Sequence, residues 1–149
     1  MRAVIQRVNR ASVRIDGSTT EKISHGLVVL LGIHGDDTTR NLQWMADKIV
    51  NLRIFEDDEG KMNRSLADIN AEMLIVSQFT LYGDCRKGRR PGYSSAAPPE
   101  IAESIYDRFI EEIKSRGIKT ATGTFRAMME VELVNHGPVT LLLDSEKNF

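Results

Sequence analysis

The chain has 149 residues, of which 41% are hydrophobic and 28% charged, and its formal net charge is -1. This length and composition are typical of one globular domain whose core needs no disulfide or metal. The near-zero charge excludes a globally basic nucleic-acid-binding protein, so any nucleic acid must be bound through a local patch. Because the sequence has one cysteine, no signal peptide and no long apolar span, we expect a cytoplasmic protein with no membrane partner.

Alternating and continuous apolar runs at the start of the chain predict three strands. Residues 1–8 and 11–15 are strand-like, Asp16-Gly17 signals a turn, and the chain then doubles back over residues 19–23. The nearly continuous apolar run at 26–33 is typical of a central strand.

A helix and then irregular chain follow. Cap residues at 36–39 and apolar residues at helical spacing predict a helix from about Thr38 to Asn51. We expect a short strand at 53–55, an acidic turn at 56–60, and irregular chain with one helical turn at 61–70.

The second half adds one helix and further strands. Residues 72–81 predict a strand buried on both faces, 82–93 a loop, and 99–117 a second helix with one apolar stripe. From Phe125 the pattern has period two, and residues 139–143 form the last strand. The sequence therefore predicts a β-rich α/β fold in a single domain, with two main helices packed on a sheet or partial barrel.

Polar side chains at the end of the 72–81 strand are the first candidate site. Ser77, Gln78 and Thr80 surround Phe79, and buried polar groups are costly unless they are paired or used. Thr80 as a nucleophile needs a base, and the neighbouring sequence supplies none. The strand end can instead offer backbone N–H groups and an amide to a developing oxyanion. A strand end satisfied by its own side chains remains the plainer alternative.

Two further stretches each have two interpretations. At Gly137-Pro138, two carbonyls can hold an ammonium group, or the pair is an ordinary hairpin turn between two strands. The second stretch lies between Tyr82 and Tyr93 and suits either phosphate binding or a solvated loop; it holds four cations in five residues, Arg86, Lys87, Arg89 and Arg90.

Metal and cofactor sites find no support in the sequence. His25, His34 and His136 are widely spaced, and no paired ligand motif or glycine-rich phosphate loop is present. Cys85 lies beside two cations that favour a thiolate, but an incidental loop cysteine is the better interpretation. We therefore expect neither a metal nor a cofactor.

Taken together, the motifs resemble those of the D-aminoacyl-tRNA deacylases, also called D-tyrosyl-tRNA deacylases. The resemblance spans essentially the whole chain and rests on four segments: Ser77-Gln78-Phe79-Thr80-Leu81, Asn135-His136-Gly137-Pro138-Val139-Thr140, the opening residues 1–8 and the loop 86–91. It implies one deacylase domain over residues 1–149, forming a homodimer of β-barrel-like subunits with helices outside. The implied reaction hydrolyses the ester of tRNA charged with a D-amino acid, or with glycine mischarged on alanine tRNA, and rejects L-amino acids.

The resemblance also implies roles for individual residues. Gln78, Phe79 and Thr80 lie beside the scissile ester, with Ser77 in the substrate pocket and the Phe79 N–H as oxyanion donor. A cis Gly137-Pro138 bond enters the partner's pocket, where its carbonyls hold the α-amino group. The remaining roles are orientation of that motif by Arg7, the adenosine pocket at Phe125 and Met129, and tRNA binding at Arg86, Lys87, Arg89 and Arg90.

The RNA 2′-hydroxyl replaces a protein base in this family. His136 departs from the family, which often has an acidic residue there, and we do not assign it a catalytic role. Two other functions stay open from the residues alone. One is a tRNA-binding module without activity, and the other is a hydrolase with Thr80 as nucleophile.

Overall fold

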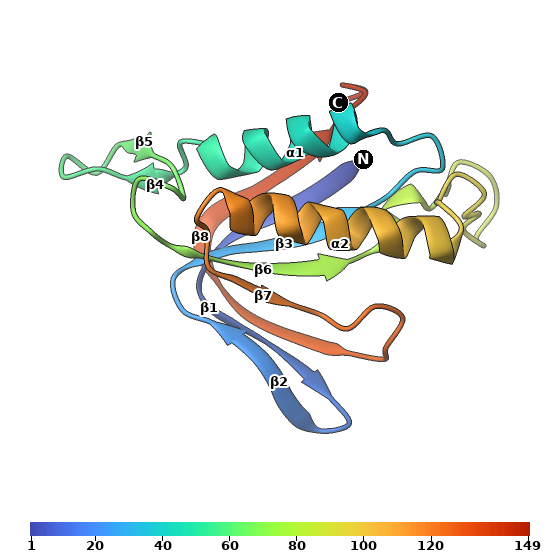
Figure 1. Cartoon of the computed structure of the whole chain (residues 1–149), viewed down its shortest axis with the longest axis horizontal. Helices are drawn as coiled ribbons and strands as arrows, with labels where there is room; N and C mark the ends of the chain where they lie inside the picture. Colours follow the sequence, from blue (N-terminus) through green and yellow to red (C-terminus); the bar gives the residue numbers. More distant parts are fainter.

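The 14-residue strand β1 organises the sheet in the computed structural model, which describes residues 1–149 apart from the side chain of Thr19. Figure 1 shows both long helices on one face of that sheet, with the β1–β2 hairpin extending away from them. The elements in chain order are β1 (Arg2–Ile15), β2 (Ser18–Ile23), β3 (Gly26–Gly32), α1 (Thr39–Asn51), β4 (Phe55–Glu56), β5 (Met62–Arg64), β6 (Glu72–Ser77), the 3-10 helix η1 (Phe79–Tyr82), α2 (Pro99–Ser115), β7 (Thr120–Thr122) and β8 (Glu130–Asp144).

The sheet has the order β2-β1-β3-β6-β7, and β8 pairs with β1. One edge of β1 pairs with β8 along nearly its whole length, while the other edge pairs first with β3 and then with β2. The pairs β3–β6 and β6–β7 are parallel, and β2 also contacts β7. The sheet is therefore barrel-like and nearly closed, as expected.

The central strands are buried on both faces, which explains their continuous apolar sequences. In β6, Met73 and Ile75 face the helices, whereas Leu74 and Val76 face a second, smaller cluster on the opposite side. The apolar stripes of α1 and α2 complete the larger cluster, with Phe109 fully buried.

Local signals fix both helices where the sequence predicts them. The Thr38 side chain caps α1 and forms a capping box with Asn41. Pro99 occupies the first turn of α2, and the chain leaves that helix through Gly117, whose φ of +80° suits glycine. None of the described helices combines the length and apolar character needed to cross a membrane.

Several predicted strand boundaries are wrong. The strand expected at 72–81 ends at Ser77, because the next four residues turn into η1. The strand expected at 53–55 is instead β4, one short partner of β5, which lies in the segment predicted to be irregular. β7 was not predicted at all; its three residues carry too short a pattern to detect.

The C-terminal pattern also needs correction. Residues 125–129 alternate in exposure but are not a strand, since the Ala127 N–H bonds back to the Thr124 carbonyl and Arg126 has a positive φ. Gly137-Pro138 is neither a hairpin turn nor a break between two strands. It is a bulge inside the single strand β8, where residues 135–140 lie opposite only residues 6–8 of β1.

Candidate active site

The end of β6 is anchored to the sheet before the chain turns. The Gln78 N–H donates to the Leu31 carbonyl at 2.8 Å, and the Leu81 N–H then closes η1 onto the Gln78 carbonyl at 3.2 Å. Ser77 and Gln78 are half-buried, whereas Phe79 and Thr80 are exposed. The four predicted residues therefore lie together at a rigid strand end that faces solvent.

Polar contacts within η1 bear on the chemistry available there. The Gln78 amide donates to the Thr80 hydroxyl. Within the described residues, no histidine or carboxylate hydrogen-bonds to the Thr80 hydroxyl. No described group accepts a hydrogen bond from the Phe79 N–H either. Thr80 thus lacks the neighbouring base that a nucleophile needs, while the Phe79 N–H is free to donate to a ligand.

Phe125 and Met129 approach this strand end from the chain between β7 and β8. The Phe125 ring packs on Tyr106 with ring centroids 6.0 Å apart, and the Tyr106 hydroxyl donates to the Ile75 carbonyl at 2.8 Å. A Cβ at Gly123 would lie 2.9 Å from the Met129 sulfur, so glycine is what lets Met129 cross this point. Both side chains are half-buried.

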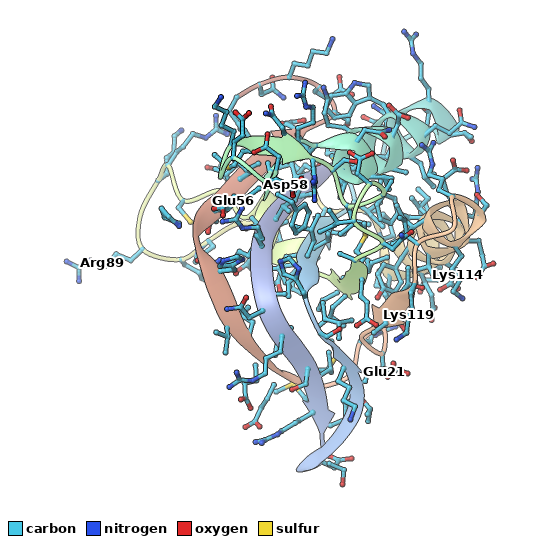
Figure 2. All side chains as sticks on the ribbon, turned by 90° about the vertical axis from the view of Figure 1, so that its left-hand side faces the viewer. Glu21, Glu56, Asp58, Arg89, Lys114 and Lys119 are labelled. Carbon is cyan, nitrogen blue, oxygen red and sulfur yellow. The ribbon has the colours of Figure 1, made fainter. Side chains whose placement is uncertain are left out.

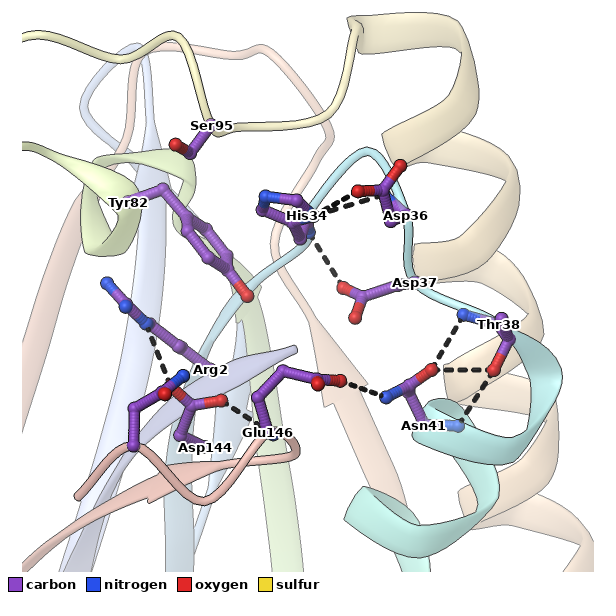
Figure 3. Close-up of a pocket in the computed structure, with 11 residues that line it drawn as sticks. Arg2, His34, Asp36, Asp37, Thr38, Asn41, Tyr82, Ser95, Asp144 and Glu146 are labelled. Carbon is purple, nitrogen blue, oxygen red and sulfur yellow. Dashed lines mark hydrogen bonds and ion pairs between the residues drawn. The ribbon is translucent and has the colours of Figure 1, made fainter.

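A polar cavity of about 430 Å³ lies behind η1 (Figure 3). Arg2 crosses it, donating from Nη1 to the Leu81 carbonyl at 3.1 Å and from Nε to Asp144 at 3.3 Å, with its guanidinium 4.7 Å from the Tyr82 ring. Burial and the nearby carboxylate of Asp37 raise the pKa of Tyr82. These contacts brace η1 from behind and hold the candidate site rigid.

Arg7 supports the Gly137-Pro138 bulge and is only 3% exposed. Its Nε donates to the His136 carbonyl at 3.2 Å and its Nη1 to the Ile54 carbonyl at 2.6 Å. The Asn135 amide donates to the Arg7 carbonyl at 2.9 Å, which ties the bulge to β1 from its other side. Gly137 and Pro138 are exposed, and the peptide bond between them is cis.

Two histidines pack beside this support. The rings of His25 and His136 lie 5.6 Å apart, and the buried Nδ1 of His136 has no hydrogen-bond partner among the described residues. Burial, with further contributions from His136 and Arg7, lowers the pKa of His25. Neither histidine ring is linked to η1 by a hydrogen bond among the described residues. The two histidines therefore lie beneath the Gly137-Pro138 bulge and not beside η1.

The two candidate motifs do not meet within one chain. The strands β3 and β1 lie between β6 and β8. They separate Ser77 at the end of β6 from the Gly137-Pro138 bulge on β8. Three strand spacings correspond to roughly 14 Å across the sheet. One copy of the chain therefore contains both motifs but does not bring them into contact.

The basic loop presents fewer free charges than its sequence suggests. Arg86 makes a bidentate pair with Asp84 at 2.8 and 2.7 Å, which lowers the pKa of Asp84 and raises that of Arg86. Lys87, Arg89 and Arg90 are exposed, and no described acidic side chain pairs with them.

Cys85 in the same loop is exposed. Among the described residues, no group of three histidine, cysteine or acidic side chains is placed to hold a metal ion.

Comparison with known proteins decides the family. A family model described as D-Tyr-tRNA(Tyr) deacylase matches residues 4–144. The chain belongs to the D-aminoacyl-tRNA deacylase family. It is 64% identical to a D-aminoacyl-tRNA deacylase of Desulfotalea psychrophila and 60% identical to one of Thermosipho africanus, with 100% of both chains covered in each case.

Two solved structures share the fold of this deacylase-family chain. One, described as c-Myc DNA Unwinding Element Binding Protein, has a TM-score of 0.91 and 43% identity, covering 97% of this chain and 98% of that one. The other, described as a probable eukaryotic D-amino acid tRNA deacylase, has a TM-score of 0.83 over 95% of this chain and 97% of that one, at 18% identity. The second likeness concerns the fold alone.

Residue patterns alone did not single out every supporting residue of the deacylase site. Arg7 was named only through the family resemblance, although counting by two from Ala3 and Ile5 places it on the buried face of β1. A charged residue at such a position signals a specific buried partner. Tyr106 and Gly123 gave no comparable signal, because an aromatic residue in a helix stripe and a loop glycine are both common.

Proposed function

We propose that this chain hydrolyses the ester bond of D-aminoacyl-tRNA and releases a free D-amino acid and tRNA. The observation that carries the proposal is membership of the deacylase family over the full chain, together with a rigid strand end that offers a free N–H group. We propose further that residues 1–149 form one deacylase domain, acting in the cytoplasm.

The chemistry is assigned to the turn after β6. The Phe79 N–H donates to the oxyanion that develops when water attacks the ester carbonyl, with Gln78 and Thr80 beside the reacting atoms and Ser77 lining the pocket. Since no described base bonds to Thr80, the 2′-hydroxyl of the terminal adenosine assists the reaction in place of a protein base. Phe125 and Met129 hold the adenosine.

The complete site is assigned to a homodimer. β8 is a 15-residue strand that pairs only with β1 among the described strands, so its outer edge is unpaired, and Leu142 of the same strand is 60% exposed. A long unpaired edge favours pairing with another chain. Such a contact brings the Gly137-Pro138 bulge of one copy to the β6 end of the other, which a single chain cannot do.

Discrimination between mirror-image substrates then follows from rigid backbone. The Gly137 and Pro138 carbonyls hold the α-amino group, and with the α-hydrogen fixed, an L side chain is forced into main-chain atoms. A D side chain points outward, and glycine has no side chain to exclude. Glycine mischarged on alanine tRNA is therefore a second substrate.

Contacts with tRNA beyond its terminal adenosine are assigned to the loop after η1. Lys87, Arg89 and Arg90 are free to meet phosphates, whereas Arg86 first has to leave Asp84.

Release of amino acid from charged tRNA tests the proposal. The protein should release D-tyrosine from D-tyrosyl-tRNA and glycine from glycyl-tRNA, and leave L-tyrosyl-tRNA intact. Binding of tRNA without turnover would support the binding module, a function in keeping with the DNA-binding name of one similar structure. Equal release of D- and L-tyrosine would refute the chiral assignment.

A further inference from the structure

Two exposed aromatic rings touch beside the candidate active site. Phe79 is 55% exposed and Tyr93 is 41% exposed, and their ring centroids lie 5.2 Å apart at an interplanar angle of 68°. Large aromatic side chains usually bury most of their surface. Because the edge of one ring meets the face of the other, the pair leaves flat apolar surface open to solvent.

The backbone holds Tyr93 in this position. Two hydrogen bonds between Asp84 and Gly92, of 2.7 and 3.0 Å, close the base of the loop just before Tyr93. The Tyr93 carbonyl accepts from the Ala96 N–H at 3.1 Å. A Cβ at Gly83 would lie 3.1 Å from the Tyr93 ring, so the ring rests against the backbone that leaves η1. The aromatic pair is therefore preformed.

Positively charged side chains lie in the loop next to the aromatic pair, and no described acidic side chain neutralises them. Lys87, Arg89 and Arg90 occupy the loop that Asp84 and Gly92 close, and no described acidic side chain pairs with them. Figure 2 shows Arg89 reaching away from the body of the molecule into solvent. Aromatic rings beside unpaired cations are the features that bind single-stranded nucleic acid, through base stacking and phosphate contacts.

We propose that Phe79 and Tyr93 form a stacking platform for a nucleobase of the unpaired 3′ strand of tRNA, next to the terminal adenosine. The inference rests on the proposed function, because the ester at η1 fixes where that strand begins. Lys87, Arg89 and Arg90 then meet the phosphates that follow along the strand. Tyr93 thereby becomes a binding residue for the polynucleotide rather than for the amino acid.

An RNA strand fits this surface better than a second protein chain does. Three cations that no described acidic side chain offsets disfavour burial against an apolar partner and suit a polyanion. Stacking is also tolerant of sequence, since every base has a flat face. The platform thus suits an enzyme that accepts tRNAs of different identity.

Paired substrates test the platform. Tyr93→Leu should raise the KM for D-tyrosyl-tRNA relative to the KM for D-tyrosyl-adenosine by about 5- to 150-fold, the range expected for loss of one stacked base. Tyr93→Phe keeps the ring and should keep the wild-type ratio of the two KM values. An unchanged ratio in Tyr93→Leu would overturn the proposal, and so would a change in oligomeric mass, because a second copy would then cover the ring.

Binding of uncharged RNA separates this proposal from the proposed function. Wild-type protein should bind intact tRNA more tightly than tRNA trimmed of its unpaired 3′ nucleotides, even if no ester is hydrolysed. Tyr93→Leu should reduce that difference, and the adenosine contacts of Phe125 and Met129 should account for what remains. Neutralising Lys87, Arg89 and Arg90 with glutamine should reduce the dependence of log K on log salt by roughly 0.7 for each lost phosphate contact. Lys114→Gln on α2, where Lys114 pairs with Glu111, is the matched control and should leave that slope unchanged. Equal affinity for intact and trimmed tRNA would refute the platform.

Discussion

Arg7→Lys tests whether Arg7 supports the Gly137-Pro138 bulge through its hydrogen-bond geometry or only through its positive charge. The guanidinium of Arg7 bonds two carbonyls at once, those of Ile54 and His136. An ammonium group on a flexible stem cannot reproduce that planar fork, so Arg7→Lys keeps the charge but loses one of the two hydrogen bonds.

The size of the effect follows from these contacts. A hydrogen bond from a charged donor contributes about 1.5–3 kcal/mol. The ion pair between Arg7 and Glu56 adds at most ~1 kcal/mol, because the two groups are 3.7 Å apart and the Glu56 side chain is 55% exposed. We expect Arg7→Lys to lower the free energy of unfolding by about 1.5–3 kcal/mol. If the lost bond is the one to His136, kcat/KM for D-tyrosyl-tRNA should fall by about 10- to 150-fold.

Urea unfolding and deacylation rates measure both quantities. Arg14→Lys is a matched control on the same strand, because Arg14 meets Glu132 at 3.5 Å with both side chains about half exposed. It should change stability by less than about 1 kcal/mol and leave the rate unchanged. Arg7→Lys with the stability and rate of wild type would refute the role assigned to Arg7.

Three other changes test separate parts of the structure. Thr80→Ala should keep deacylation within about tenfold of wild type, since no described base activates that hydroxyl. A loss of about 10³-fold in this variant, together with an acyl adduct trapped on Thr80 of the wild-type protein, would make Thr80 the nucleophile. Tyr106→Phe should lower the free energy of unfolding by about 0.5–1.5 kcal/mol, measured in urea, because the buried Ile75 carbonyl loses its hydroxyl donor but keeps the Gly123 N–H at 3.0 Å. Because the pKa of His25 is lowered from 6.5 in the folded state, the unfolded chain binds more protons below that pH, and stability should fall as pH drops below about 6.5. His25→Gln should flatten that part of the curve, and an unchanged curve would exclude His25 as its source.

Local signals in the sequence were sufficient for the helices. Thr38 as a cap, Pro99 in a first turn and continuous apolar stripes are determined by neighbouring residues, so α1 and α2 lie where they were predicted. Strand ends depend instead on partners far along the chain. β6 stops at Ser77 because η1 packs beside β3, and no residue within 72–81 carries that information.

The candidate site was predictable to a similar extent. The polar run from Ser77 to Thr80 identified the candidate site, because buried polar groups are costly unless they are paired or used. The Gly137-Pro138 pair was interpretable as an ordinary turn until its pairing was known, because a bulge inside β8 is defined by the register of β1. Its proposed relation to the β6 end requires a second copy of the chain, which no pattern within one sequence can specify.

A mixed-dimer experiment tests most directly whether two copies build one site. Phe79→Pro removes the proposed oxyanion donor at the first position of η1, where proline is tolerated. Gly137→Ala adds a methyl group that its own chain accommodates, since a Cβ there lies 3.4 Å from the Asn135 side chain, but that would enter the partner's pocket.

Each variant alone should be inactive. In mixed dimers, one site combines the intact η1 of one copy with the intact bulge of the other, so an equal mixture should recover roughly one quarter of the wild-type rate per chain. No recovery on mixing, from variants that are each folded and dimeric, would contradict the account.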